Sequence, residues 1–276
     1  MVNGMVLNMD KITMYILTHK KFDYEDIEEK QMYKPLLNGS ACLNEDFGYI
    51  RDDAGENISN LNKYYAELTG EYWAWKNDDS DIIGFCHYRR YFTKNIFLNK
   101  IGEKDIRKIL SKYDIILPQK IYPDKINIEE EIKDSPTCQK KEDYDVIREI
   151  IAKESPEYLE SFDEVLNEKW CYWYNMFICR KELADDYFNW LFNILKIFKN
   201  QHDFSQYEEN NMRVLGYLSE RLLNVYVRKN KLKIKEKYLL HSHFKIPFLR
   251  IIENRFPFFA KFNTRLYNIL DSIFSL

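Results

Sequence analysis

Four short runs of mainly apolar residues have the pattern of buried β-strands. They are rich in β-branched and aromatic residues, and polar or turn-forming residues bound them. The first run reads ITMYILTH, and Pro118 ends the third because proline cannot donate to a strand ladder. The predicted strands cover residues 12–19, 81–87, 113–118 and 171–180.

Apolar residues between these strands recur three and four positions apart, which predicts amphipathic helices. Segment 59–77 begins with a Ser-Asn pair, either member of which can cap a helix. A Ser-Pro pair at 155–156 divides segment 142–168 into two helices, because proline begins a helix well and continues it badly. Further helices are predicted at 102–113, 181–199 and 209–229.

Strands that alternate with helices imply an α/β fold, with a mixed, mainly parallel sheet flanked by helices. In such folds, ligands bind beyond the carboxyl ends of the strands. One long loop, 38–59, is rich in glycine and turn-forming residues, and a loop of this length within a compact domain is usually functional or disordered. One domain is expected to occupy residues 1–230.

The last part of the chain, residues 231–276, is expected to form a basic, aromatic extension. From residue 228 onward the net charge is about +8, whereas the whole chain carries −3. After Pro257, apolar residues recur at helical spacing between basic ones, as in helices that lie on anionic membrane surfaces. The alternative is a helix docked on the domain core or on a second subunit of a homo-oligomer.

Composition narrows the classes of protein further. Aromatic residues make up 16% of the 276 residues, and such rings often line sites for sugars or bases, although AT-rich codon usage would have the same effect. The five cysteines show no paired spacing and no Cys/His cluster, so neither a disulfide framework nor structural zinc is predicted. No signal-peptide pattern and no membrane-spanning apolar run occurs. We expect a cytoplasmic protein, either free or peripheral on the inner face of the cell membrane.

The segment HYRRYF, residues 87–92, completes the second predicted strand and continues past its end. Arg89 and Arg90 would therefore lie at the ligand-binding edge of the sheet, where guanidinium groups suit phosphate oxygens. The sequence lacks the glycine-rich dinucleotide fingerprint and the P-loop, as well as GxSxG, HExxH and EF-hand patterns. Nucleotide-sugar transferases then lead among phosphate-binding classes. The structural alternative is that both arginines pair with nearby surface acids.

Seven segments together form a specific signature. They are THKKFD (18–23), GYIRDDAGENIS (48–59), YAELTGEYWAWKN (65–77), GFCHYRRYF (84–92), YDIILP (113–118), YNMFICRKE (174–182) and GYLSERLLNVY (216–226). In this order they resemble a bacterial family first catalogued as a domain of unknown function and later grouped with capsule and exopolysaccharide glycosyltransferases. The pairing of ELTxxYWAWKN with CHYRRYF is more specific than either motif alone, and the likeness covers roughly residues 12–230.

This resemblance implies a nucleotide-diphospho-sugar transferase (GT-A) fold. It also implies transfer of a sugar, expected to be galactofuranose or galactose, from a UDP-sugar to a growing, lipid-linked capsular or exopolysaccharide glycan. Thr18, His19 and Lys20 follow the first strand, where this fold receives the base and the ribose. The donor site is also expected to include Asn57, Glu67, Trp75, His87 and Tyr88.

Many transferases of this fold bind the donor diphosphate through a metal that an Asp-x-Asp motif holds. The corresponding strand end here carries no carboxylate, so Arg89 or Arg90 is expected to neutralise the leaving diphosphate directly. No cofactor is therefore expected to be required. If Mn²⁺ or Mg²⁺ binds, Asp52 and Asp53 are the candidate ligands, and turn capping is the structural alternative for both.

Sugar transfer with inversion needs a carboxylate that takes the proton of the acceptor hydroxyl. Glu220 is the first candidate, with Arg221 beside it to hold the carboxylate or a phosphate. The structural alternative is an ordinary ion pair on a helix surface. Asp143 and Asp145 are weaker candidates for the base, and Asn175 is expected to bond a sugar hydroxyl.

Two other functions fit parts of the pattern. Basic residues interleaved with rings also suit a non-catalytic module that binds RNA or an anionic polysaccharide, although the negative net charge and the lack of an RNP-type motif argue against nucleic acid. A nucleotidyltransferase on a similar sheet would need a pair of carboxylates for metal. The family pattern also leads us to expect a histidine near Gln139 or Lys140, and this chain has none there, which bears on the choice of acceptor.

Overall fold

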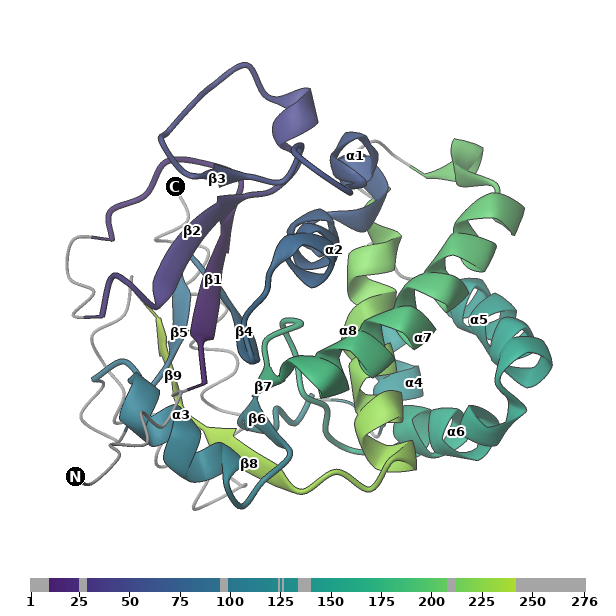
Figure 1. Cartoon of the computed structure of the whole chain (residues 1–276). Coiled ribbons are helices and arrows are strands. Elements are labelled where there is room, and N and C mark those ends of the chain that lie inside the picture. Colours follow the sequence, from purple (N-terminus) through teal and green to yellow (C-terminus); the bar gives the residue numbers. More distant parts are fainter. Residues whose placement is uncertain are drawn as a thin grey trace, which may run out of the picture.

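The computed structural model describes residues 10–24, 29–94, 99–123, 125, 127–133, 140–207 and 212–241. Over these residues the chain forms a nine-stranded sheet with helices packed against it (Figure 1). The strands are β1 (Ile12–Thr18), β2 (Tyr33–Leu37), β3 (Ile50–Arg51), β4 (Ile82–His87), β5 (Arg90–Phe92), β6 (Ile115–Pro118), β7 (Ile178–Arg180), β8 (Ile234–Lys237) and β9 (Leu239–His241).

Most helices lie together on one side of the sheet, where α7 and α8 are central, whereas α3 belongs to the core on the other face (Figure 1). The α-helices of the described residues are α1 (Asn62–Tyr65), α2 (Leu68–Asn77), α3 (Glu103–Leu110), α4 (Ile128–Lys133), α5 (Lys141–Glu154), α6 (Leu159–Asn167), α7 (Lys181–Gln201) and α8 (Val214–Lys229). Short 3-10 helices occur at Ser40–Cys42, Ser59–Leu61, Pro156–Tyr158 and Phe204–Gln206.

The strand order along the sheet is β3-β2-β1-β4-β7-β6-β8, and β5 pairs with β4 and β9 beside this path. Strands β3, β2, β1 and β4 are parallel to one another, and β8 is parallel to β6, whereas β7 is antiparallel to β4 and β6. The predicted α/β class with a mixed, mainly parallel sheet is therefore confirmed. The parallel half brings the carboxyl ends of β1, β2 and β4 to one edge, where ligands bind in such folds.

Strands β1 and β4 are central, and their side chains alternate between the two apolar cores. In β1, Tyr15 and Leu17 pack with the helices α2, α7 and α8, while Met14 and Ile16 pack with α3 on the other face. Burial on both faces explains why β1 reads as a nearly continuous apolar run. In β4, Gly84 is required by this packing, because a Cβ atom there would lie 2.3 Å from the Sδ atom of Met14.

Several elements differ from the sequence-based prediction. The predicted helix 59–77 is divided into α1 and α2, because Ala66 between them has a φ of +49°. The predicted strand 171–180 is reduced to β7, since Tyr174 and Asn175 also have positive φ. The prediction misses the short strands β3 and β5, the polar strand β8, the strand β9, and also β2, which contains a proline.

The region after residue 230 contributes to the sheet as far as the structure describes it. Strand β8 pairs in parallel with β6, and β9 pairs antiparallel with β5, so both strands extend the sheet of the preceding domain. The amphipathic helix expected after Pro257, and the rest of the basic extension from residue 242 onward, lie outside the described residues.

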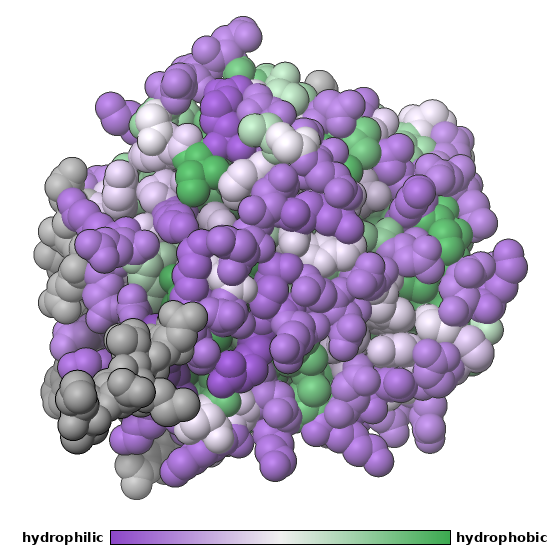
Figure 2. Space-filling model, in the orientation of Figure 1, coloured by the Kyte–Doolittle hydropathy of each residue, from purple (hydrophilic) through white to green (hydrophobic). Residues whose placement is uncertain are grey.

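The surface seen in Figure 2 is largely hydrophilic, and its apolar residues lie in small, separate spots. Within the described ranges, Tyr122 is the one large apolar side chain that is exposed. None of the helices in the described part of the chain combines the length and the apolar character needed to cross a membrane.

Candidate active site

The residues that follow β1 and β4 meet at the carboxyl edge of the sheet, because these strands are adjacent and parallel. Tyr88 lies at the centre of this group. The ring of His19 contacts the Tyr88 ring edge-on, with 5.6 Å between the centroids. The Lys20 ammonium and the Arg89 guanidinium lie 5.5 and 5.2 Å from the Tyr88 centroid. The structure thus brings these four predicted residues together.

Several cations affect His19. Burial lowers the pKa of the His19 imidazole, and the charges of Lys20, Arg89 and Arg213 lower it further, because another cation is unfavourable beside them. Arg213 directly precedes α8 and was not predicted. We call Lys20, Arg89 and Arg213, whose charges act on the neutral His19 ring, the cationic cluster. Positive charges gathered at a sheet edge favour an anionic ligand.

Arg90 and His87 lie next to this cluster and contact the loop before β7. The Arg90 guanidinium is 4.2 Å from the centroid of the Tyr174 ring. His87 Nε2 lies 2.9 Å from the backbone oxygen of Tyr174, and since a carbonyl only accepts, this nitrogen carries the proton. Burial lowers the pKa of His87 to about 4, so its ring is neutral at pH 7.

Glu220 on α8 approaches the same loop. The side chain is nearly buried, its Oε1 accepts a hydrogen bond of 3.1 Å from the Tyr174 N–H, and its Oε2 accepts one of 3.4 Å from Arg221 Nη1. Burial raises the pKa of Glu220 to about 7; Arg221 opposes this rise and the charge of Glu67 adds to it. A carboxyl group that titrates near neutral pH can serve as a general base.

Arg221 is fully buried and contacts two carboxylates. Besides its bond to Glu220, its Nη2 donates to Glu131 Oε2 on α4 at 3.1 Å, and its guanidinium lies 4.2 Å from the Trp173 ring centroid. The ion pair between Glu220 and Arg221 therefore exists, but it is inside the protein and not on a helix surface.

Asn175 joins the segment before α2 to α8. Its Nδ2 donates to Glu67 Oε1 at 2.9 Å and to the backbone oxygen of Gly216 at 3.0 Å. Glu71, one turn further along α2, is also buried, and burial together with the charges of Glu67 and Glu220 raises its pKa well above the ordinary range. The prediction missed Glu71, although its four-residue spacing from Glu67 places both carboxylates on one helix face.

Unusual backbone conformations gather around these residues. In the described ranges, the residues other than glycine with positive φ are Ala66, Tyr174, Asn175 and Lys231. The first three belong to the segments that present Glu67 and contact Glu220. Non-glycine residues rarely adopt such conformations, and they persist where surrounding contacts fix them, often at functional sites.

Buried polar atoms without a partner also concentrate here. Within the part of the chain that the structure describes, six such side-chain atoms have no hydrogen-bond partner: Arg90 Nε, Trp173 Nε1, Asn175 Oδ1, Arg221 Nε, Glu71 Oε1 and Asn38 Oδ1. Asn38 follows β2, and its Oδ1 lies against Gly70 of α2. Each unsatisfied buried group costs about 1–3 kcal/mol unless ordered water or a ligand satisfies it, so their concentration marks this region as a candidate site.

Asp52 has a structural role in the long loop. It is fully buried, and its carboxylate accepts hydrogen bonds from the N–H groups of Gly39 and Ser40, both at 2.8 Å, and from Ser59 Oγ at 2.5 Å. Both oxygens are engaged. These contacts match the turn-capping alternative.

Asp53 and Asn57 also make contacts within their loop. Asp53 pairs with Arg51 at 2.7 Å, which lowers the pKa of Asp53, and Asn57 Nδ2 donates to the backbone oxygens of Asp53 and Gly55. The described residues contain no group of three or more His, Cys, Asp or Glu side chains placed to hold a metal ion.

Thr18 and Trp75, both predicted in the donor site, make contacts within the protein. The Thr18 hydroxyl is buried and donates to the backbone oxygen of Lys20 at 2.7 Å, so it shapes the turn after β1. Trp75 stacks on Phe192 of α7, with 5.7 Å between ring centroids, and packs on Phe188. Core packing on α7 is its observed role.

The weaker candidates for the base are both on α5. Asp143 is fully buried, accepts hydrogen bonds from the Lys140 N–H and the Tyr207 hydroxyl, and has its pKa raised by burial. Asp145 pairs with Lys141 in an exposed ion pair. Neither carboxylate has a contact with Glu220 or with the cationic cluster among those described, so Glu220 is the better candidate.

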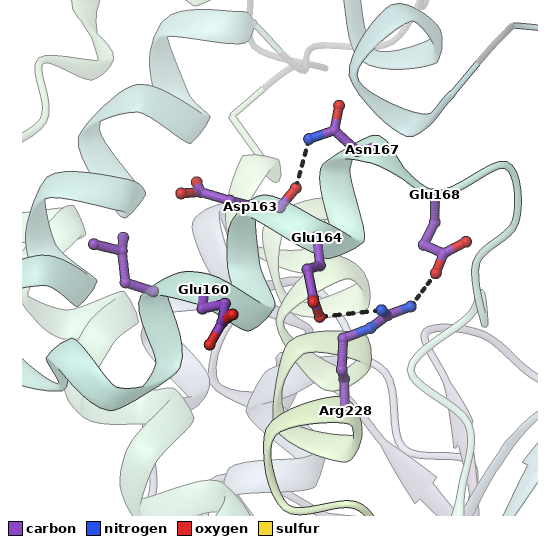
Figure 3. A pocket seen from close by; sticks show the side chains of 7 residues that line it. Glu160, Asp163, Glu164, Asn167, Glu168 and Arg228 are labelled. Atoms are coloured by element: carbon purple, nitrogen blue, oxygen red, sulfur yellow. Dashed lines mark hydrogen bonds and ion pairs between the residues drawn. The ribbon is translucent and has the colours of Figure 1, made fainter.

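A separate hollow of about 730 Å³ lies beside α6 and α8 (Figure 3). Arg228 crosses from α8 and donates to Glu164 at 3.1 Å, and it also pairs with Glu168 (Figure 3). The other lining residues are Leu159, Glu160, Asp163 and Asn167. Because the cation here is already neutralised by carboxylates, this hollow suits an anionic ligand less well than the carboxyl edge of the sheet does.

Comparison with known proteins bears on this site. Residues 13–231 match the model of a family described as a domain of unknown function (DUF4422). The apo structure of WbbM, a bifunctional glycosyltransferase, is similar with a TM-score of 0.76 and 29% sequence identity. The match covers 84% of this chain and 45% of the WbbM chain, so this chain corresponds to less than half of that protein. No curated protein sequence matches. The structural likeness confirms the predicted GT-A-like fold.

Proposed function

The chain belongs to the DUF4422 family, and on this premise we propose that it is a glycosyltransferase that takes its sugar from a nucleotide donor. The structural likeness to WbbM supports transferase activity, although the chain spans less than half of that protein. The resemblance of the sequence to capsule and exopolysaccharide transferases supports the same class.

The observation that carries the proposal is that Arg90, which follows Arg89 of the cationic cluster in the chain, also acts on Glu220. Arg90 connects the two: it stacks on the Tyr174 ring, and the Tyr174 N–H binds Glu220. Its charge also opposes the rise in the pKa of Glu220. Displacement of a nucleotide from a sugar needs both features, because negative charge develops on the leaving diphosphate while the acceptor hydroxyl loses a proton.

In the proposed reaction, the acceptor oxygen attacks the anomeric carbon as the bond to the diphosphate breaks. The Glu220 carboxylate takes the hydroxyl proton, and the bonding electrons leave with the nucleoside diphosphate. Arg89, Arg90 and Lys20 stabilise that charge, a contribution that is large where donors are held in place before the reaction. Asn175 Oδ1, which is buried and has no partner among the described residues, accepts a hydrogen bond from a sugar hydroxyl.

The carboxylates that were predicted as metal ligands do not fit that role in this conformation. Both oxygens of Asp52 are hydrogen-bonded, and Asp53 is paired with Arg51. We therefore assign neutralisation of the diphosphate to arginine and lysine side chains. The proposed activity does not require a divalent cation, which assays with Mn²⁺, with Mg²⁺ and with a chelator test directly.

The proposal for the donor and the acceptor rests on the resemblance of the sequence to capsule and exopolysaccharide glycosyltransferases. The donor is UDP-galactofuranose or UDP-galactose, and the acceptor is a growing, lipid-linked capsular or exopolysaccharide glycan. The enzyme works in the cytoplasm at the inner face of the membrane, where the basic extension contacts anionic lipid. No nucleic acid takes part, and a homo-oligomer is compatible with the proposal.

The direct test is release of UDP from a panel of UDP-sugars by the purified chain, alongside the thermal shift that each compound produces. We expect UDP to stabilise the protein with or without Mn²⁺. The Arg89→Ala variant should lose this stabilisation, whereas Arg148→Ala should retain it, because Arg148 lies in an exposed ion pair with Asp163.

Three outcomes would contradict the proposal. Salt-sensitive binding of oligonucleotides or polysaccharides without UDP binding would favour the non-catalytic module. Release of pyrophosphate from a nucleoside triphosphate would indicate a nucleotidyltransferase. Equal stabilisation of both arginine variants by UDP would show that the nucleotide does not bind at the cationic cluster.

A further inference from the structure

One buried cation is shared between two carboxylates from different helices. Arg221 Nη2 lies 3.1 Å from Glu131 Oε2 on α4, and Arg221 Nη1 lies 3.4 Å from Glu220 Oε2 on α8. The Arg221 side chain is wholly buried, and those of Glu131 and Glu220 are only 18% and 11% exposed. Water therefore screens these charges weakly, and the division of the cation between them has a large effect.

The two contacts differ in length. The shorter one goes to Glu131, so part of the Arg221 charge is compensated before it acts on Glu220. A cation that paired with Glu220 alone would hold that carboxylate in its charged form and make it a poor base. The Trp173 ring also contacts Arg221, with 4.2 Å between the guanidinium carbon and the ring centroid.

We propose that Glu131 is a positioning residue for proton transfer: by holding Arg221, it keeps Glu220 basic enough to accept a proton near neutral pH. The proposal rests on the proposed function for the role of Glu220 as the base. It assigns a role to α4, a helix that the sequence did not connect with the site, and it explains why the buried arginine has two partners.

Other groups also act on Arg221, Glu131 and Glu220, and substitution of Glu131 leaves those groups unchanged. Glu220 is affected by the charges of Glu67 and Arg90 and by the N–H of Tyr174, and it acts in turn on Glu71. The ionisable groups that face Arg221 and both carboxylates from α5 and from the loop before β7 are Tyr144 and Cys171.

The test substitutes Glu131 and follows the protonation of Glu220 directly. Infrared difference spectra report the carboxyl C=O band, which is assigned to Glu220 by its loss in Glu220→Gln. We expect the pH midpoint at which this band titrates to fall by roughly one unit in Glu131→Gln, because one nearby charge shifts a pKa by about this amount. Glu131→Asp retains the negative charge but places it further from Arg221, so the midpoint should fall less than in Glu131→Gln. Glu130→Gln, the same change on the neighbouring residue of α4, should leave the midpoint in place.

A pH profile of UDP release gives the second readout. In Glu131→Gln, the acid limb of kcat/KM should move to lower pH by the same amount, and the plateau should fall because a more acidic carboxylate is a weaker base. A lower plateau with an unmoved limb would mean that Glu131 only supports packing, and the proposal would be overturned. An unmoved infrared midpoint would overturn it as well.

The infrared readout does not depend on turnover, so it separates this inference from the proposed function. A shifted midpoint in a protein that releases no UDP from any nucleotide sugar would refute the proposed function and leave the electrostatic coupling in place. If Glu131→Gln does not fold, Glu131→Asp carries the test, and an unchanged midpoint in that variant would contradict the coupling.

Discussion

Glu220→Gln should make the protein more stable at alkaline pH while it removes activity. The substitution keeps the shape of the side chain and removes its ionisation. In the folded chain, burial raises the pKa of Glu220 from an ordinary value of 4.5 to about 7. The charged form that the reaction needs is therefore unfavourable in the folded state.

The direction and the size of the effect follow from proton linkage. Because the folded pKa is raised, the folded state binds the proton more tightly than the unfolded state does. This stabilisation is fully present below the unfolded pKa and is lost as pH rises through about 7. Each unit of pKa shift corresponds to about 1.4 kcal/mol. Between pH 5 and pH 8, the unfolding free energy of wild type should therefore fall by about 2–3 kcal/mol more than that of Glu220→Gln.

Urea unfolding of both proteins at pH 5 and pH 8, followed by circular dichroism, measures this difference. The control is Glu157→Gln, because Glu157 is exposed. The difference in stability between this variant and wild type should be nearly the same at both pH values. Turnover of Glu220→Gln should fall by roughly 10²–10⁴, with nucleotide binding retained. If the stability of Glu220→Gln relative to wild type does not change with pH, then folding does not make the charged form of Glu220 unfavourable, and the prediction is wrong.

Three further predictions test other parts of the molecule. Arg89→Ala or Arg90→Ala should each lower transfer by more than tenfold in a folded protein, since a lost charge-assisted contact costs about 1.5–3 kcal/mol; near-normal rates in both would remove the site assignment. Asp52→Ala should lower the unfolding free energy by about 3 kcal/mol in urea, and Asp53→Ala by under about 1 kcal/mol; equal losses would contradict the capping role. A chain that ends near residue 242 should stay folded and bind UDP but no longer sediment with anionic liposomes; if the full-length chain also ignores them at low salt, the proposed membrane contact is wrong.

The sequence predicted the central strands and the position of the arginines because both depend on local patterns. Strands β1 and β4 are buried on both faces, so their apolar runs are nearly continuous. The adjacency of parallel strands then placed Arg89 and Arg90 at the carboxyl edge of the sheet, where the structure also has them. No comparable local signal exists for β8, with the sequence IKEK, because it pairs with β6, whose residues lie over a hundred positions away.

The rest of the site depends on contacts that no local pattern contains. Glu131 joins the site through Arg221, 90 residues away, and Asn175 reaches Glu67 across 108 residues. The pattern of residues 171–180 predicted one continuous strand, because aromatic residues favour strands. The positive φ of Tyr174 and Asn175 interrupts that strand, and this same interruption turns the Tyr174 N–H to Glu220.

Helix α8 shows why the buried charges are better explained by function than by stability. It is buried along most of its length, and an arginine and a glutamate at such positions lose their hydration on folding. Apolar residues of similar size would often be as stable or more so. Arg221 Nε has no partner among the described residues, and burial raises the pKa of Glu220 to about 7 even though Arg221 opposes this rise. These features are unfavourable in a purely structural helix but suit proton transfer beside a cationic cluster, where ionisable groups with shifted pKa values are expected.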